Sequence, residues 1–430
     1  MITQVEKMQK EVLVIEGKRK LQGILRVSGA KNSALPNMAA TILTDKEVIL
    51  ENLPDLLDVK LMKQLLEDIG SHIDCIDNNV CSFRLSSPKS FVANYDIVSK
   101  MRASILVLGP MVARFGYAEV ALPGGCSIGA RPVDLHLKAL EMMGAKIELQ
   151  HGYIKAYAPK GLKGAHIFFE KITVTGTENI MMAAVLAEGQ TIIENAALEP
   201  EVVDLAKMLK KMGADIQGEG TPRIVINGVK ELNGTKHTII PDRIEAGTFA
   251  VLSALSDGKI IIQNYPMEYL EYVNEVFKDI GIYILPVDKD KVIIKREERL
   301  KPVDIQTKEY PLFPTDLQAQ FMTLLCFADG VSQITENIFE NRFMHVSELN
   351  RMGADIKIVD RTAIIKGIKE LTGADVKATD LRASAAMVIA GLVADGITKI
   401  HNIYHLDRGY EHIDTKLKNI GANLWREINE

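Results

Sequence analysis

A short phrase recurs six times along this chain, and it constrains the fold more than any other feature. Each copy places apolar residues at helical spacing, then a glycine, then a short apolar run, as in LLEDIGSHI, ALEMMGAKI and KLKNIGANL. The six glycines are Gly70, Gly144, Gly213, Gly281, Gly353 and Gly421, at steps of 74, 69, 68, 72 and 68 residues. Because glycine commonly ends helices, each phrase predicts a helix, a glycine C-cap and a following strand. Six such units fill the 430 residues.

A second landmark lies between these phrases and indicates a second helix in each unit. An apolar helical run ends at an acidic residue followed by glycine and then by a β-prone segment such as TIIEN or SQITEN. The glycines are Gly189, Gly258, Gly330 and Gly396, and Lys46 and Gly116 occupy the matching place in the first two units. Each repeat is therefore predicted to be a β/α unit with two helices.

Mostly polar residues stand 14 positions before these landmarks, where the helices are expected to begin. The six positions are Asn32, Arg102, Thr175, Ile244, Asp316 and Arg382, with Lys31 and Arg243 one place earlier in their units. Helix amino termini carry unpaired N–H groups and partial positive charge, so several of them brought together would bind an anion. At any single position the alternative is a polar residue that simply caps its helix.

Length and composition exclude several classes of protein. A chain of 430 residues favours two or three domains, and 47% hydrophobic with 25% charged residues is typical of soluble globular proteins. The net charge of -5 disfavours a broad basic surface for nucleic acid. The first 17 residues lack the apolar core of a signal peptide, and the uncharged stretch 383–394 is too short to span a bilayer. We expect a cytoplasmic protein with neither a nucleic-acid nor a membrane partner.

The cysteines direct attention to one loop. Cys75, Cys81, Cys126 and Cys326 are too few and too scattered for a disulfide framework, and no CxxC pair suggests zinc. Cys126 lies in the glycine-rich phrase LPGGCSIGARPVDLH, and Arg131 follows five positions later, where a guanidinium would lower the thiol pKa. A small buried residue is the alternative, but the two glycines before Cys126 favour a reactive thiol on a loop that could close as a lid.

Eight phrases of this chain resemble the enolpyruvyl transferase family. They are SGAKN at 28–32, MRASI at 101–105, LPGGCSIGARPVDLH at 122–136, PDRIEAGTF at 241–249, FPTDLQAQF at 313–321, ENRFMHV at 340–346, TDLRASAA at 379–386 and YHLDRGYE at 404–411. The resemblance implies an α/β fold of two inside-out prism domains with three repeated β/α units each, which agrees with the six units counted above. It implies one domain at residues 33–240, carrying the Cys126 loop, and a discontinuous one at 1–32 plus 241–430, with the substrates held between them.

The same resemblance implies a reaction without cofactor or metal. The enolpyruvyl group of phosphoenolpyruvate would move to the 3'-hydroxyl of UDP-N-acetylglucosamine by addition and elimination, with release of phosphate, as the first committed step of peptidoglycan synthesis. Cys126 would donate a proton towards carbon 3, form a covalent adduct and be the target of fosfomycin. Asp316 would accept the proton of the sugar hydroxyl. The alternative reading of Asp316 is a helix N-cap.

The binding residues are also implied by the resemblance. Phosphoenolpyruvate carries a phosphate and a carboxylate, which suit cationic groups, and its expected contacts are Lys31, Asn32, Arg131, Arg382 and Arg408. The expected contacts of UDP-N-acetylglucosamine are Asn32, Arg102, Arg131, Pro132, Val133, Asp134, Leu135, Lys171, Thr173, Val174, Thr175, Asp316 and Ile338. Arg342 and Asp380 are expected to orient this set.

Two competing functions stay open at the level of sequence. A relative that uses shikimate 3-phosphate performs the same chemistry on another alcohol, and the Cys126 loop argues for the sugar-nucleotide branch instead. A non-catalytic paralogue could keep the fold and bind the nucleotide sugar only. The presence of Cys126, Asp316, Lys31, Arg382 and Arg408 together argues against that reading, because a pure binding protein has no evident need for an acid and a base.

Overall fold

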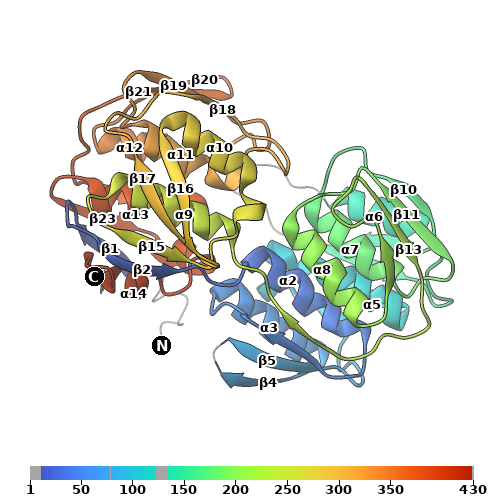
Figure 1. The fold of residues 1–430 in the computed structure, drawn as a ribbon. Coiled ribbons are helices and arrows are strands. Elements are labelled where there is room, and N and C mark those ends of the chain that lie inside the picture. The colour runs from blue at the N-terminus through green and yellow to red at the C-terminus, as the bar shows by residue number, and fades with distance from the viewer. Residues whose placement is uncertain (1–10, 78, 123–132, 429–430) are drawn as a thin grey trace. The chain divides into compact units, whose positions relative to one another are not determined.

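Three four-stranded sheets and a set of buried helices form each of two parts of the chain, as the computed structural model shows for residues 11–77, 79–122 and 133–428 (Figure 1). Residues 11–28 and 241–428 make up one part, the discontinuous unit. Residues 29–122 and 133–240 make up the other, the inserted unit. Residues 29–32, which the sequence assigned to the discontinuous domain, group with the inserted unit because the helix that begins at Lys31 packs on helices of that unit.

All six sheets have the same strand arrangement. The first strand, at one edge, pairs in parallel with the second. The second and third strands pair antiparallel, and so do the third and fourth. The sheets of the discontinuous unit are β2 (Gly23–Arg26), β15 (Ile260–Gln263), β17 (Lys291–Arg296) and β16 (Ile282–Asp288); β18 (Asp304–Gln306), β19 (Val331–Thr335), β21 (Thr362–Lys366) and β20 (Asp355–Val359); and β22 (Asp375–Lys377), β23 (Ile397–His401), β1 (Glu11–Glu16) and β24 (Asn423–Ile428).

The inserted unit repeats this arrangement three times. Its sheets are β14 (Thr235–Thr238), β3 (Val48–Glu51), β5 (Val80–Arg84) and β4 (His72–Asp77); β6 (Val92–Ala93), β7 (Tyr117–Ala121), β9 (Tyr153–Tyr157) and β8 (Lys146–Gln150); and β10 (His166–Phe168), β11 (Gln190–Glu194), β13 (Arg223–Asn227) and β12 (Asp215–Gln217). Three units in each part confirm the repeat count made from the sequence.

The helices fall between these strands. Those of the inserted unit are α2 (Lys31–Ala40), η1 (Thr41–Leu43), α3 (Leu57–Ile69), α4 (Tyr95–Val98), η2 (Arg102–Val107), α5 (Leu108–Phe115), α6 (Asp134–Met142), α7 (Val174–Ala184) and α8 (Pro200–Lys211). Those of the discontinuous unit are α9 (Arg243–Leu255), η3 (Met267–Tyr269), α10 (Glu271–Ile280), η4 (Thr315–Leu317), α11 (Gln318–Leu325), α12 (Val346–Arg351), α13 (Leu381–Val393), η5 (Ile403–Arg408) and α14 (Ile413–Lys418).

Both landmarks of the repeat are confirmed. The six phrase glycines have φ between 92° and 123° and follow the ends of α3, α6, α8, α10, α12 and α14. A side chain with a Cβ is strained at such a φ, which explains why glycine recurs there. The six positions found by counting back 14 residues lie in the first turns of α2, η2, α7, α9, η4 and α13. The four α-helices among them are largely buried; in α9, for example, 12 of the 13 residues are buried.

Two strands are exchanged between repeats near the points where the chain changes unit. Strand β2 precedes α2 in the sequence but pairs in parallel with β15, and β14 precedes α9 but pairs in parallel with β3. Strand β1 lies between β23 and β24, with Glu11 opposite Ile428 (blue beside red in Figure 1). The amino-terminal strand therefore completes the last repeat.

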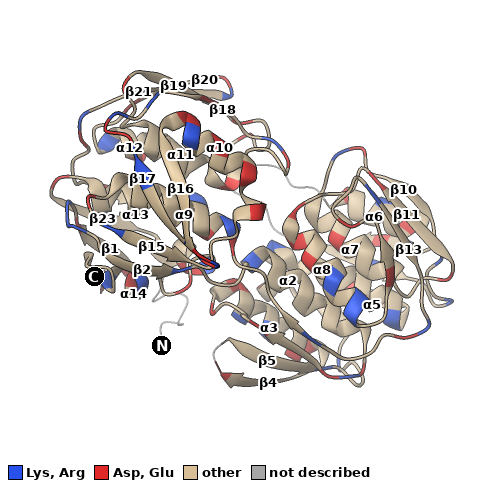
Figure 2. Ribbon diagram, viewed as in Figure 1, with Lys and Arg blue, Asp and Glu red and all other residues tan. Residues whose placement is uncertain are grey.

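Charged residues of both signs are interspersed over the helices and strands of each unit (Figure 2). Within residues 11–77, 79–122 and 133–428, no helix has both the length and the apolar character needed to cross a membrane.

Candidate functional site

The carboxylate of Asp316 is held between two buried guanidinium groups of the discontinuous unit. Its Oδ1 lies 2.8 Å from Nη2 of Arg342, and its Oδ2 lies 3.0 Å from Nη2 of Arg382. The arginine side chains are 6% and 4% exposed, whereas that of Asp316 is 27% exposed, so the carboxylate is the part of this cluster that solvent reaches. Although burial opposes ionisation, Arg382 and Arg342 hold the pKa of Asp316 well below its usual range.

The N-cap reading of Asp316 is wrong. Pro314 is the N-cap residue of η4, and the Asp316 side chain forms ion pairs instead of a cap. True side-chain caps occur in the neighbouring repeats, where Asp242 accepts from two backbone N–H groups of α9 and Asp380 accepts from those of Arg382 and Ala383 at 2.8 and 3.1 Å. The expected role of Asp380 thus has a concrete form, since it fixes the first turn of the helix that carries Arg382.

A polar network behind Arg382 joins three helices. Nη1 of Arg382 donates to the hydroxyl of Tyr410 at 3.5 Å, and this hydroxyl lies 2.9 Å from Oγ1 of Thr248 on α9. Nε2 of Gln320 on α11 donates to Tyr410, to Thr248 and to the carbonyl of Asp316 at 3.2, 3.1 and 3.1 Å. The amino-terminal halves of α9, α11 and α13 are therefore joined around Asp316, as the helix-terminus argument predicted for several repeats.

Glu336 is a positioning residue that the sequence analysis missed. It is buried, and its carboxylate accepts from the hydroxyls of Thr307 and Thr315 and from the backbone N–H of Ile338 at 2.9 Å. Thr315 in turn accepts from Nη1 of Arg342 at 3.1 Å. Glu336 thus links the loop of Ile338 to the arginine that grips Asp316. Its place just after β19, in the phrase SQITEN, was the available signal.

Other charged groups lie in the same unit near the point where the chain leaves it. Nζ of Lys416 donates to Glu245 at 2.7 Å and to the hydroxyl of Ser28 at 2.6 Å, and that hydroxyl donates to Glu411. Arg408, at the end of η5, is half-buried, and its charge contributes to the lowered pKa of His405, for which burial is the main cause. These contacts bring the SGAKN, PDRIEAGTF and YHLDRGYE phrases together.

In the inserted unit, Lys31 opens α2 and forms an ion pair with Asp58 in the first turn of α3. Nζ of Lys31 lies 3.3 Å from Oδ2 of Asp58, and the two side chains are 11% and 4% exposed. Ser33, in the same helical turn as Lys31, holds this turn in place by donating to the carboxylate of Asp204. The same carboxylate lies 3.0 Å from Nε2 of His237. The backbone at Lys31 is therefore held in place, and its side chain is partly exposed.

A second polar centre of the inserted unit surrounds His136. Nδ1 of His136 lies 3.0 Å from Nδ2 of Asn179, and its Nε2 lies 3.4 Å from Oγ1 of Thr175. Burial lowers the pKa of His136 to about 4, opposed by the charge of Asp134 and assisted by that of Arg102. The structure thus gathers Arg102, Asp134 and Thr175, all expected contacts of the nucleotide sugar, around a neutral imidazole. Thr173 caps α7 by accepting from the N–H of Gly176 at 3.2 Å.

The remaining predicted residues differ in what the structure says of them. Asn32 and Lys171 are exposed, and Val133, Val174, Leu135 and Ile338 are partly buried. Cys126, Arg131 and Pro132 lie outside the described residues. Among the described residues, no group of three or more histidine, cysteine, aspartate or glutamate side chains could hold a metal ion.

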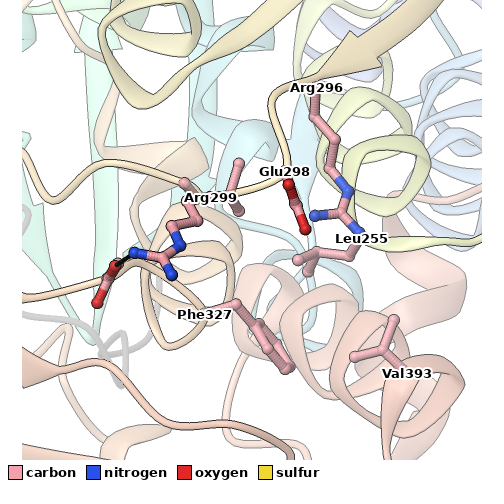
Figure 3. Close-up of a pocket in the computed structure, with 8 residues that line it drawn as sticks. Leu255, Arg296, Glu298, Arg299, Phe327 and Val393 are labelled. Carbon is pink, nitrogen blue, oxygen red and sulfur yellow. Dashed lines mark hydrogen bonds and ion pairs between the residues drawn. The ribbon is translucent and has the colours of Figure 1, made fainter.

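One hollow of the discontinuous unit, of about 460 Å³, lies away from these residues (Figure 3). Arg296, Glu298 and Arg299 line it together with the apolar side chains of Leu255, Phe327 and Val393, and Arg299 pairs with Asp329 at 3.5 Å. None of the predicted site residues that the structure describes is among its lining, so the proposed chemistry is not assigned to this hollow.

Comparison with known proteins agrees with the resemblance. The family model of EPSP synthase (3-phosphoshikimate 1-carboxyvinyltransferase) matches residues 15–417. The protein named UDP-N-acetylglucosamine 1-carboxyvinyltransferase 2 from Carboxydothermus hydrogenoformans is 52% identical over 419 residues, which cover 97% of this chain and 99% of that protein.

Solved structures establish the fold. The enolpyruvyl transferase NikO from Streptomyces tendae is 24% identical, with a TM-score of 0.88 over 97% of this chain and 98% of that one. EPSP synthase from Acinetobacter baumannii is 18% identical, with a TM-score of 0.77 over 97% and 99% of the two chains. Together with the six four-stranded sheets, these similarities confirm the predicted two-domain prism fold.

Proposed function

Because this chain belongs to the enolpyruvyl transferase family whose model it matches over residues 15–417, we propose that it transfers the enolpyruvyl group of phosphoenolpyruvate to the 3'-hydroxyl of UDP-N-acetylglucosamine and releases phosphate. The acceptor is taken from the relative that is 52% identical over nearly the whole chain. In this proposal the enzyme acts in the cytoplasm, in the first committed step of peptidoglycan synthesis.

The observation that carries the catalytic proposal is the ionised Asp316 carboxylate between Arg342 and Arg382. A carboxylate so strongly stabilised accepts hydrogen bonds well but is a weak base. If an anionic substrate binds Arg382, the guanidinium shares its donors with the new anion, and the pKa of Asp316 rises. Binding of phosphoenolpyruvate would thereby make Asp316 a stronger base when the sugar hydroxyl must lose its proton.

The cationic groups have complementary roles in this proposal. Arg382 and Arg408 of the discontinuous unit and Lys31 of the inserted unit bind the phosphate and carboxylate of phosphoenolpyruvate and offset the charge that develops as the tetrahedral intermediate forms. Arg102, Asp134 and Thr175 bind the nucleotide sugar around the neutral His136. Cys126 donates the proton that carbon 3 receives, and Arg131 favours its thiolate after that transfer.

The test is release of phosphate from phosphoenolpyruvate with UDP-N-acetylglucosamine or shikimate 3-phosphate as acceptor. We expect release only with the nucleotide sugar, and a large loss in Cys126→Ser and in Asp316→Asn. Release only with shikimate 3-phosphate would assign the chain to the other branch of the family. No release with either acceptor, while the nucleotide sugar still binds, would identify a non-catalytic paralogue.

A further inference from the structure

The edge hairpin of one sheet in the inserted unit carries two cysteines that face each other. Cys75 on β4 and Cys81 on β5 are register partners, with Cα atoms 4.0 Å apart, and a disulfide joins them. The sequence analysis expected no disulfide framework, and spacing alone gave no sign of this pair because the hairpin turn that aligns it was not identified. Cys75 is exposed on the edge strand, whereas Cys81 is fully buried.

A lysine from the adjoining helix contacts both sulfur atoms. Nζ of Lys63, on α3, lies 3.0 Å from Sγ of Cys81 and 3.3 Å from Sγ of Cys75. The side chain is half-buried, and this burial lowers the pKa of Lys63, against the charge of nearby Asp55. An ammonium group within hydrogen-bond distance of a sulfur stabilises its thiolate over its thiol.

We propose that Cys75, Cys81 and Lys63 form a thiol–disulfide exchange site that reacts with low-molecular-weight thiols and disulfides. Exposure assigns the two sulfurs different roles. Cys75 is the one that an external reagent reaches, and Cys81 is the resolving partner beneath it. Lys63, whose closer contact is with Cys81, stabilises the buried sulfur as the leaving group. This site is independent of the proposed transfer reaction.

The exchange balances as two successive displacements. In reduction, an external thiolate attacks Sγ of Cys75, the Cys75–Cys81 bond breaks, and Cys81 leaves as a thiolate beside Lys63. A second external thiolate attacks the external sulfur of the mixed disulfide, which releases the external disulfide and the Cys75 thiolate. The two electrons come from the two external thiols, and their protons end on Cys75 and Cys81 or in solvent. Oxidation by an external disulfide is the reverse sequence.

Cys326 provides an internal contrast. It is the buried C-cap residue of α11, and burial raises its pKa to about 12, while its Sγ donates to the carbonyl of Met322 at 3.3 Å. A thiol so enclosed reacts slowly with reagents in solution, since the thiolate is the nucleophile. Among the described cysteines, exchange should therefore be confined to the hairpin pair.

The first test equilibrates the full-length protein in glutathione buffers over a range of reduced-to-oxidised ratios. After acid quenching, free thiols are alkylated, and the peptides that contain Cys75 and Cys81 are quantified by mass spectrometry. The proposal expects one reversible two-electron transition, with a mixed disulfide of glutathione found on Cys75 and not on Cys81. It is overturned if both cysteines stay free thiols even in fully oxidised glutathione, or if the disulfide persists in fully reduced glutathione.

The second test measures the rate at which oxidised glutathione closes the reduced pair. Lys63→Met should slow closure about three- to fourfold if the ammonium lowers the thiol pKa by about one unit, because the thiolate fraction falls about tenfold while the more basic thiolate is about threefold more nucleophilic. Lys63→Arg should restore most of the rate. Lys60→Met, one turn earlier on the same helix and paired with Asp55 at 2.8 Å, is the matched control and should leave the rate unchanged. Equal rates in native protein and Lys63→Met would remove Lys63 from the site.

Discussion

The two units repeat one backbone plan, but the polar centre around Asp316 in one unit is charged and the centre around His136 in the other is neutral. In the discontinuous unit, the first turns of the helices carry full charges, with Asp316 between Arg342 and Arg382. In the inserted unit, the ion pair of Lys31 and Asp58 lies in the first turns of α2 and α3, but the polar centre around His136 and α7 holds groups that burial keeps neutral. His136 has its pKa lowered to about 4, and Glu178, on α7, has its pKa raised well above its usual range.

This difference teaches that the repeat fixes where polar groups stand and not what charge they carry. Burying an ion costs free energy unless it is paired, so we interpret the buried ion pairs around Asp316 as serving the chemistry of the site. That chemistry is the proposed proton transfer and anion binding. In the inserted unit, neutral hydrogen-bonding groups suffice to position the residues proposed to bind a nucleotide sugar.

Removing the central carboxylate should have the largest effect. Asp316→Asn leaves Arg342 and Arg382 without their counter-charge and removes the proposed base, so we expect kcat to fall about 1,000-fold and the free energy of unfolding to fall by about 3 kcal/mol. Phosphate release and urea unfolding measure the two effects. Unchanged kcat in a variant that folds normally would contradict the role of Asp316.

Variants of the two arginines should distinguish substrate binding, proposed for Arg382, from the positioning of Asp316 by Arg342. Arg382→Met should raise the KM for phosphoenolpyruvate roughly 100-fold, whereas Arg342→Met should raise it roughly tenfold or less, because only Arg382 is proposed to bind the substrate. Steady-state kinetics with varied phosphoenolpyruvate measures this ratio. Equal effects on KM would mean that both arginines act only through Asp316.

The neutral imidazole of His136 should make the free energy of unfolding depend on pH in acid. Burial lowers the pKa of His136 in the folded chain to about 4, so between about pH 6.5 and pH 4 the imidazole is protonated in the unfolded chain and neutral in the folded chain. The free energy of unfolding therefore falls as the pH drops through this range. His136→Gln should remove about 2–3 kcal/mol of that loss. Urea unfolding at several pH values tests this. His166→Gln, whose native side chain is 65% exposed in the same unit, is the control.

Glu178 should show the opposite dependence on pH. Its raised pKa means that the folded chain holds a proton that the unfolded chain releases, so stability falls as pH rises above about 4.5. Glu178→Gln should therefore gain stability relative to the native chain as the pH rises from 5 to 8. Unfolding measured at both pH values tests the gain, with the exposed Glu188→Gln as control. A gain that does not depend on pH would mean that Glu178 is ionised in both states.

The repeat made the fold predictable, while the contacts of the site were less accessible. Gly70 and its five counterparts stand where only a residue without a Cβ adopts the backbone angle easily, so they mark the helix ends in the sequence itself. The helix starts near Asp316 and Arg382 followed by counting from the second landmark. The pairing of Asp316 with Arg342 depends on how a loop after β19 folds back, and no local pattern encodes it.

Two further failures have the same cause. Glu336 gains its importance only when β19 and the segment around Thr307 and Thr315 lie together, which the sequence does not show. The boundary after residue 32, which the resemblance implied, falls inside α2, and this helix packs with the inserted unit through contacts between distant segments. Patterns with a local cause were readable, and pairings between distant segments were not.

The position of β1 between β23 and β24 has a consequence for synthesis on the ribosome. All strands of the inserted unit have been made once β14 emerges, so that unit can fold while the rest of the chain is still being translated. The discontinuous unit must wait, because β1 is among the first segments made and its two neighbours are among the last. Its amino-terminal strand therefore stays unpaired through most of translation, and pairing across nearly the whole chain is the slow step expected of such distant contacts.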